Sequence, residues 1–143
     1  MAGYNSIVGT NDNDRLIGTP GSDDIDGLDG NDIIKGGGGD DILVGGRGDD
    51  RVLGGAGGDL FNVWIGNRDI DARDRYFGGS GQDDLFADVF ATRDHIGVLL
   101  FDTVRGIFGF SKAATQSTIS GIEGFTAFTD YRVRAIGGAE DNT

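Results

Sequence analysis

The 143-residue sequence contains no cysteine, one proline and one histidine. Without cysteine the chain has no disulfide, no thiolate zinc site and no cysteine nucleophile. A single proline excludes a collagen-like chain and a proline-rich linker. The lone histidine, His95, excludes a metal site built on a histidine pair and a conventional triad with a spare base. No apolar run approaches the ~18 residues that a membrane-spanning helix needs.

Acidic residues and glycine are abundant instead. The chain holds 24 acidic and 12 basic residues, a formal net charge of −12, and 28 glycines. Such a surface repels nucleic acid and anionic membranes and favours cations. High charge with low hydrophobicity is typical of disordered chains, so the spacing of the acidic residues has to decide between disorder and a fold.

That spacing is a nine-residue repeat. Six consecutive units run from residue 9 to residue 62, and a seventh covers residues 78–86. Position one is always glycine: Gly9, Gly18, Gly27, Gly36, Gly45, Gly54 and Gly78. Position four is Asp12 and then Gly21, Gly30, Gly39, Gly48, Gly57 and Gly81. Position six is always aspartate: Asp14, Asp23, Asp32, Asp41, Asp50, Asp59 and Asp83. Position eight is always apolar: Leu16, Ile25, Ile34, Leu43, Val52, Phe61 and Leu85.

Each part of the unit has a physical role. Glycines at positions one, two and four are expected to take positive φ, so that the loop turns sharply and its carbonyls point inward. Aspartate at position six adds a hard carboxylate beside those carbonyls. The last residues of the unit suit a very short strand with the eighth side chain inward. Units stacked in parallel at about 4.8 Å would join these side chains into one core.

The repeat resembles the repeats-in-toxin (RTX) family, whose motif is G-G-x-G-x-D-x-U-x with U apolar. The units at residues 36–44, 45–53 and 78–86 match it best. The resemblance implies an all-β fold, a right-handed parallel β-roll in which two successive units form one turn. It also implies that calcium ions lie between loops stacked on the same edge.

Two columns of aspartates follow from that architecture. Asp14, Asp32 and Asp50 should line one edge, and Asp23, Asp41 and Asp59 the other. Each ion would bind carboxylates from loops two units apart, together with the loop carbonyls of positions one and four. Asp83, at position six of the seventh unit, is expected to be a ligand as well. The continuous array then offers about four calcium sites. Asn5, at position six of a preceding fragment, would add a weaker site with Asp23, and Asp12 would assist or distort its own site.

The alternative to a folded array is a flexible glycine-rich linker. Without calcium the aspartate columns repel one another, and the thin core cannot offset the ordering entropy of so many glycines. We therefore expect a disordered metal-free chain and a β-rich chain in calcium.

The repeat register breaks at residues 63–77, which we interpret as an exposed excursion because mixed charges show no apolar periodicity there. Asp69 and Asp71 resemble the opening of an EF-hand loop, but Asp74 stands where that loop requires glycine. The predicted domains are a β-roll over residues 1–86 and a continuous, degenerate capping region over 87–143. In the latter, strands are expected at 96–101, 105–110 and 117–125.

Other motifs carry less information. Arg47-Gly48-Asp49 spells an integrin-binding tripeptide but falls out of the repeat frame, and Ser80 lacks the glycine that a nucleophile elbow needs. The nine-residue spacing of carboxylates suits metal ligation rather than acid–base catalysis. We therefore expect no enzyme activity, no catalytic residue and no cofactor besides calcium.

Two functions remain from the sequence. The first is a calcium-dependent folding module of a secreted, extracellular bacterial protein, because the RTX resemblance implies type I export and no N-terminal signal peptide is visible. The alternative is an accessory module that binds polysaccharide or a cell surface for a larger enzyme or adhesin. In both cases we expect the chain to be part of a longer array of repeats.

Overall fold

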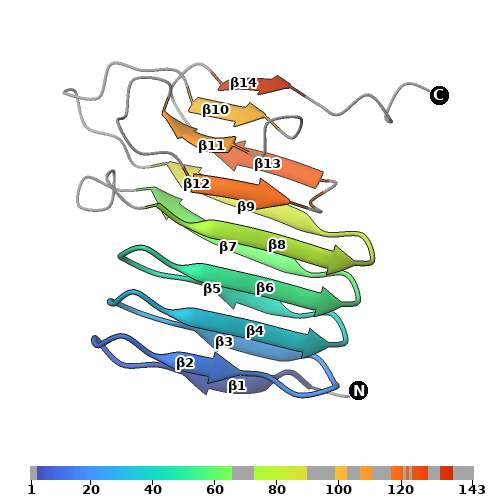
Figure 1. Cartoon of the computed structure of the whole chain (residues 1–143). Helices are drawn as coiled ribbons and strands as arrows, with labels where there is room; N and C mark the ends of the chain where they lie inside the picture. The colour runs from blue at the N-terminus through green and yellow to red at the C-terminus, as the bar shows by residue number, and fades with distance from the viewer. Residues whose placement is uncertain are drawn as a thin grey trace.

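The structure is a computed structural model that describes residues 3–65, 73–89, 99–102, 107–110, 117–120, 122, 124–128 and 133–136. In these ranges all regular structure is β, and no helix could cross a membrane. The strands of the repeat region are β1 (Asn5–Val8), β2 (Arg15–Ile17), β3 (Asp23–Asp26), β4 (Ile33–Gly38), β5 (Ile42–Val44), β6 (Arg51–Ala56), β7 (Leu60–Ile65), β8 (Arg75–Ser80) and β9 (Asp84–Val89). They alternate between two sheets, so each coil of the chain contributes one strand to each (Figure 1).

Pairing within both sheets is parallel throughout the repeat region. Ile25 lies beside Leu43, and Leu43 beside Phe61, which is one coil of 18 residues each time. Ile34 and Val52 have the same offset in the other sheet. Two nine-residue units therefore make one turn, and the fold is the parallel β-roll that the repeat predicts.

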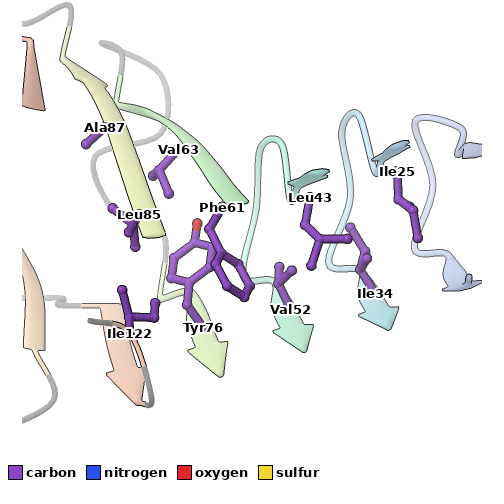
Figure 2. Close-up of a cluster of buried hydrophobic side chains, with 10 residues drawn as sticks. All are labelled: Ile25, Ile34, Leu43, Val52, Phe61, Val63, Tyr76, Leu85, Ala87 and Ile122. Carbon is purple, nitrogen blue, oxygen red and sulfur yellow. The ribbon is translucent and has the colours of Figure 1, made fainter. Parts of the chain in front are cut away.

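The core is a single layer of position-eight side chains between the sheets. Ile25, Ile34, Leu43, Val52 and Phe61 are fully buried and follow one another along the roll (Figure 2). The position-seven and position-nine side chains point outward because side chains alternate along a strand. One layer of side chains is a thin core, so the loops at the two edges matter for stability.

The segment 63–77 differs from the exposed excursion expected for it. Val63, Asp74 and Tyr76 are buried, and Tyr76 packs edge-on against Phe61 with ring centroids 5.9 Å apart. Val52 pairs with Tyr76, an offset of 24 residues instead of 18. Asp74 thus takes position six and Tyr76 position eight of a unit lengthened by six residues. The prediction of an exposed excursion was therefore wrong at Val63, Asp74 and Tyr76. Burial and strand pairing continue the repeat there, although this unit lacks a glycine at position one.

Five further strands follow: β10 (Leu99–Asp102), β11 (Ile107–Phe110), β12 (Ser117–Ser120), β13 (Gly124–Phe128) and β14 (Val133–Ile136). Strands β10 to β13 overlap the predicted strands, whereas β14 was not predicted. The segment 117–125 splits into β12, parallel to β8, and β13, parallel to β9. Strand β11 pairs antiparallel with both β10 and β12, so the purely parallel stack ends there. The division into two domains at residue 86 stays a prediction. Residues 66–72, with Asp69 and Asp71, and residues 90–98, with His95, lie outside the described ranges.

Candidate metal centre

The position-six aspartates form a column along each edge of the roll. In each column the backbone N–H of one aspartate donates to Oδ1 of the aspartate one coil further on. The N···O distances are 2.8 Å for Asp14 to Asp32, 2.9 Å for Asp32 to Asp50 and 3.0 Å for Asp50 to Asp74. On the other edge they are 2.8 Å for Asp23 to Asp41, 3.0 Å for Asp41 to Asp59 and 2.9 Å for Asp59 to Asp83. The two columns are those expected from the resemblance to the RTX roll, and each gains one member beyond the continuous array.

The second carboxylate oxygen, Oδ2, faces the position-one glycines. A Cβ placed on Gly36 would overlap Asp41 Oδ2 and would lie 2.7 Å from the Gly54 carbonyl oxygen of the next coil. The Cβ position of Gly54 converges in the same way on Asp59 Oδ2 and the Gly78 carbonyl. Each of these points therefore gathers a carboxylate oxygen and a carbonyl oxygen from adjacent coils.

Several of these oxygens lack a hydrogen-bond donor. Asp32, Asp41 and Asp59 are almost completely buried, at 1 to 2% exposure, and their Oδ2 atoms accept no hydrogen bond from the residues that the structure describes. A buried anionic oxygen beside a carbonyl is unfavourable unless a cation lies between them. Oxygen-only surroundings with carboxylate and carbonyl ligands fit calcium.

Burial also makes it harder to ionise these carboxyls. Burial raises the pKa of Asp59 to about 6, against the opposing hydrogen bond from Asp41, while the charges of Asp41, Asp83 and Asp40 raise it further. Burial likewise raises the pKa values of Asp32 and Asp41. In the absence of a cation the roll therefore disfavours the ionised carboxylates that a cation needs.

A family model matches the repeats that form these columns. The RTX calcium-binding nonapeptide repeat matches the chain in four copies, over residues 8–43, 26–61 and 35–69. The chain carries RTX calcium-binding repeats. A search of curated proteins gives no significant match.

The position-one glycines of the RTX repeats are needed for a different reason from the one expected. From Gly9 to Gly54 none of them has positive φ. They are glycine because a Cβ would enter the space of Oδ2 and of the neighbouring carbonyl. Positive φ occurs at positions two and four, as at Gly37 and Gly39, and begins only with the third unit.

From Gly30 to Gly81, a Cβ placed at position four would meet backbone atoms of the preceding coil before any carboxylate Oδ2. The Gly39 carbonyl packs against Gly57, and the Gly57 carbonyl against Gly81, so these carbonyls stack on one another. The Asp12 carbonyl similarly lies against Gly30, and its side chain is exposed. Consistent with this, no three acidic or histidine side chains converge within the described ranges. A cation here would draw on backbone carbonyls for most of its ligands.

Position five forms a second ladder of hydrogen bonds between coils, which the sequence analysis did not predict. Asn31 donates its N–H to Asn13 Oδ1 over 2.7 Å and accepts the N–H of Asp49 over 2.9 Å. Asp40 plays the same part on the other edge, accepting from Gly58 over 2.8 Å. This ladder runs opposite to the position-six ladder. The signal was present, since position five holds short side chains with an acceptor oxygen in unit after unit.

Asn5 acts differently from a metal ligand. Its side-chain N–H donates to Asp23 Oδ1 over 2.8 Å, so the amide occupies this oxygen itself. The weaker Asn5–Asp23 site therefore receives no support from the geometry.

Proposed function

We propose that the chain is a calcium-dependent folding module of a secreted protein, in which calcium ions between adjacent coils hold the two aspartate columns together. The position-six aspartates and the position-one carbonyls provide the ligands. The buried Oδ2 atoms of Asp32, Asp41 and Asp59 are the observation that supports this function. The proposed ion count remains about four.

The energetics favour a coupling of binding to folding. The core is one side chain thick, whereas each column places like charges one coil apart. A ligand that binds only the folded chain stabilises it by about 2.7 kcal/mol per site when its concentration is 100 times the Kd. A few such sites are comparable with the whole stability of a small domain. Extracellular calcium modules work at roughly 10⁻⁴–10⁻³ M, so the chain would stay unfolded in a calcium-poor cytosol and fold after export.

A calcium titration of the metal-stripped chain, followed by far-UV circular dichroism, tests this function. We expect a cooperative gain of β signal in the submillimolar to millimolar range. Magnesium at equal concentration should produce much less, because it requires a compact octahedral site. Identical spectra with and without calcium would refute the proposed function. We attribute no catalysis to the module, since the repeat is a structural calcium-binding unit.

A second candidate function, binding of an anionic polysaccharide, is favoured by the charge on one face. The outer face of the sheet containing β2, β4, β6 and β8 carries the exposed residues Arg15, Lys35, Arg51 and Arg75. Arg51 also lies 4.8 Å over the ring of Phe77. Strands β1, β3, β5, β7 and β9 of the other sheet contain no lysine or arginine. A flat basic face on a chain of charge −12 suits a polymer with regularly spaced carboxylates.

Binding of polygalacturonate in saturating calcium, with neutral dextran as the control polymer, tests this candidate. The triple variant Arg15→Gln, Arg51→Gln, Arg75→Gln should lose binding at least tenfold. Arg47→Gln should not, because Arg47 lies in an edge loop and pairs with Asp29 at 3.3 Å. Equal binding by both variants would show that the basic face does not bind the polysaccharide.

A further inference from the structure

The first two loops of the roll carry threonine at position two, whereas the third loop has Leu28 there and the later repeat loops have glycine. Thr10 donates its backbone N–H and its hydroxyl to Asp14 Oδ2, over 2.6 and 2.9 Å. Thr19 donates its backbone N–H to Asp23 Oδ2 over 2.5 Å, and its hydroxyl lies 3.1 Å from the same oxygen and 3.2 Å from the Gly21 carbonyl oxygen, its two acceptors. Each of the two Oδ2 atoms thus accepts a threonine backbone N–H and has the hydroxyl of the same threonine within hydrogen-bond distance.

The threonine hydroxyls are themselves held in place. Thr10 Oγ1 accepts the N–H of Asp12 over 3.2 Å, and Thr19 Oγ1 accepts the N–H of Gly21 over 3.1 Å. Neither loop has positive φ at position two or position four. Proline at position 20 further restricts Thr19, because the residue before proline avoids the helical region. The same closed loop therefore occurs twice, once at each edge of the first coil.

The later loops take another form. Positions two and four have positive φ at Leu28 and Gly30, and at Gly37 and Gly39. The Leu28 N–H then donates to Asp26 Oδ1 over 3.1 Å, away from the carboxylate of its own unit. The Oδ2 atoms of Asp32 and Asp41 consequently face the Gly45 and Gly54 carbonyls without a donor from the described residues.

We propose that Thr10 and Thr19 make the first coil a calcium-independent cap, and that calcium binding begins at Asp32 and Asp41. The threonine donors satisfy the oxygen that a cation would otherwise neutralise, so the interfaces between Asp14 and Asp32 and between Asp23 and Asp41 hold no ion. This rests on the proposed calcium-binding function. It removes the two N-terminal sites of the four expected from the sequence, while Asp59 offers a further interface with the Gly78 carbonyl on the C-terminal side.

Electrostatics and position in the fold agree with a cap. Burial alone would raise the pKa of Asp23, but hydrogen bonds from the Thr19 N–H, Asn5 and the Thr19 hydroxyl lower it below its usual value. Asp32 and Asp41 show the opposite shift. The first coil, made of β1 and β2, lies at the end of the stack (Figure 1). Solenoids need an atypical terminal unit, and a coil that is satisfied without metal can serve as a template for the next.

Calorimetric counting of calcium per folded chain in two matched double variants tests the cap. Asp14→Asn with Asp23→Asn should keep the wild-type ion count and a calcium midpoint within about twofold. Asp32→Asn with Asp41→Asn should lose two ions and raise the midpoint at least tenfold. Equal losses in both variants would overturn the cap and leave the calcium function standing. No loss in either would overturn the assignment of calcium to these columns altogether.

A second pair of variants tests the threonines directly. Thr10→Gly with Thr19→Gly gives the first coil the position-two glycine found in the units that begin at Gly36, Gly45, Gly54 and Gly78, so up to two additional ions should bind. Thr10→Ser with Thr19→Ser keeps the hydroxyls and should leave the count unchanged. An unchanged count in the glycine variant would show that the threonines do not keep calcium out.

Discussion

Asp41 donates its backbone N–H to Oδ1 of Asp59 over 3.0 Å, and both side chains are buried. The two oxygens of the Asp41 and Asp59 carboxylates therefore have different roles. Oδ1 accepts a backbone N–H of the preceding coil, and Oδ2 lies beside the position-one glycine of its own unit and the position-one carbonyl of the next coil. This arrangement leaves no room for a side chain at Gly36 or Gly54.

Gly36→Ala should be strongly destabilising, because its Cβ would overlap Asp41 Oδ2 and approach the Gly54 carbonyl at 2.7 Å. We expect a loss of about 1–3 kcal/mol in calcium and a clear rise in the calcium midpoint. Gly38→Ala is the matched control, since its nearest neighbour, the Pro20 carbonyl, lies at 3.4 Å and its φ is not positive. Urea unfolding of both variants in saturating calcium measures the difference, and equal stabilities would contradict the role given to position one.

Leu28→Gly should stabilise the roll. Leu28 is the only non-glycine residue of the described ranges with positive φ, at 76°. That conformation costs an L-residue about 1–2 kcal/mol. Glycine avoids this cost but loses more conformational entropy on folding, which offsets about 0.5–1 kcal/mol of the gain. A net gain of about 0.5–1 kcal/mol in urea unfolding is expected. Leu28→Ala keeps the unfavourable φ and should show no gain; a gain of equal size would point to the lost side chain instead.

The strict nine-residue period identified the repeat, and the resemblance to the RTX family then implied the roll, its two-unit coil and both aspartate columns. Sequence reasoning missed Asp74 and Tyr76, which carry positions six and eight of a unit without its glycine. Only pairing between strands restores that register. It also assigned Gly36 a conformational role, whereas the constraint is crowding by Asp41 Oδ2 of the same unit and by the Gly54 carbonyl of the next coil. Such contacts between coils are not visible in one repeat read alone.

Asn31→Ala should weaken the position-five ladder. The variant loses the oxygen that accepts the N–H of Asp49, while its own N–H still reaches Asn13. Because the site is exposed and water can replace the lost acceptor, a loss of only about 0.5–1 kcal/mol is expected. Asn11→Ala, at exposed position three of the first loop, is the control. Hydrogen exchange of the Asp49 amide should also accelerate in the Asn31 variant alone; protection that stays the same would exclude the ladder as its source.

Acid should have opposite effects with and without calcium. The pKa of Asp59 is raised from 3.8 to about 6 in the metal-free roll, mainly by burial, and those of Asp32 and Asp41 are raised too. The folded chain then binds more protons than the unfolded chain, so its stability rises as the pH falls from above 6 to about 4. Calcium needs the ionised form, so over the same range its affinity falls.

Circular dichroism between pH 7 and pH 4 separates the two effects. In metal-stripped buffer the β signal should increase as the pH falls, and in calcium the midpoint of the calcium titration should move to higher concentration. Asp59→Asn keeps the Oδ1 acceptor for Asp41 but cannot titrate, so the acid-induced gain without metal should become smaller. Asp24→Asn, on the exposed outer face of β3, should leave that gain unchanged. A metal-free chain that loses β signal on acidification would contradict the raised pKa values and the buried columns from which they arise.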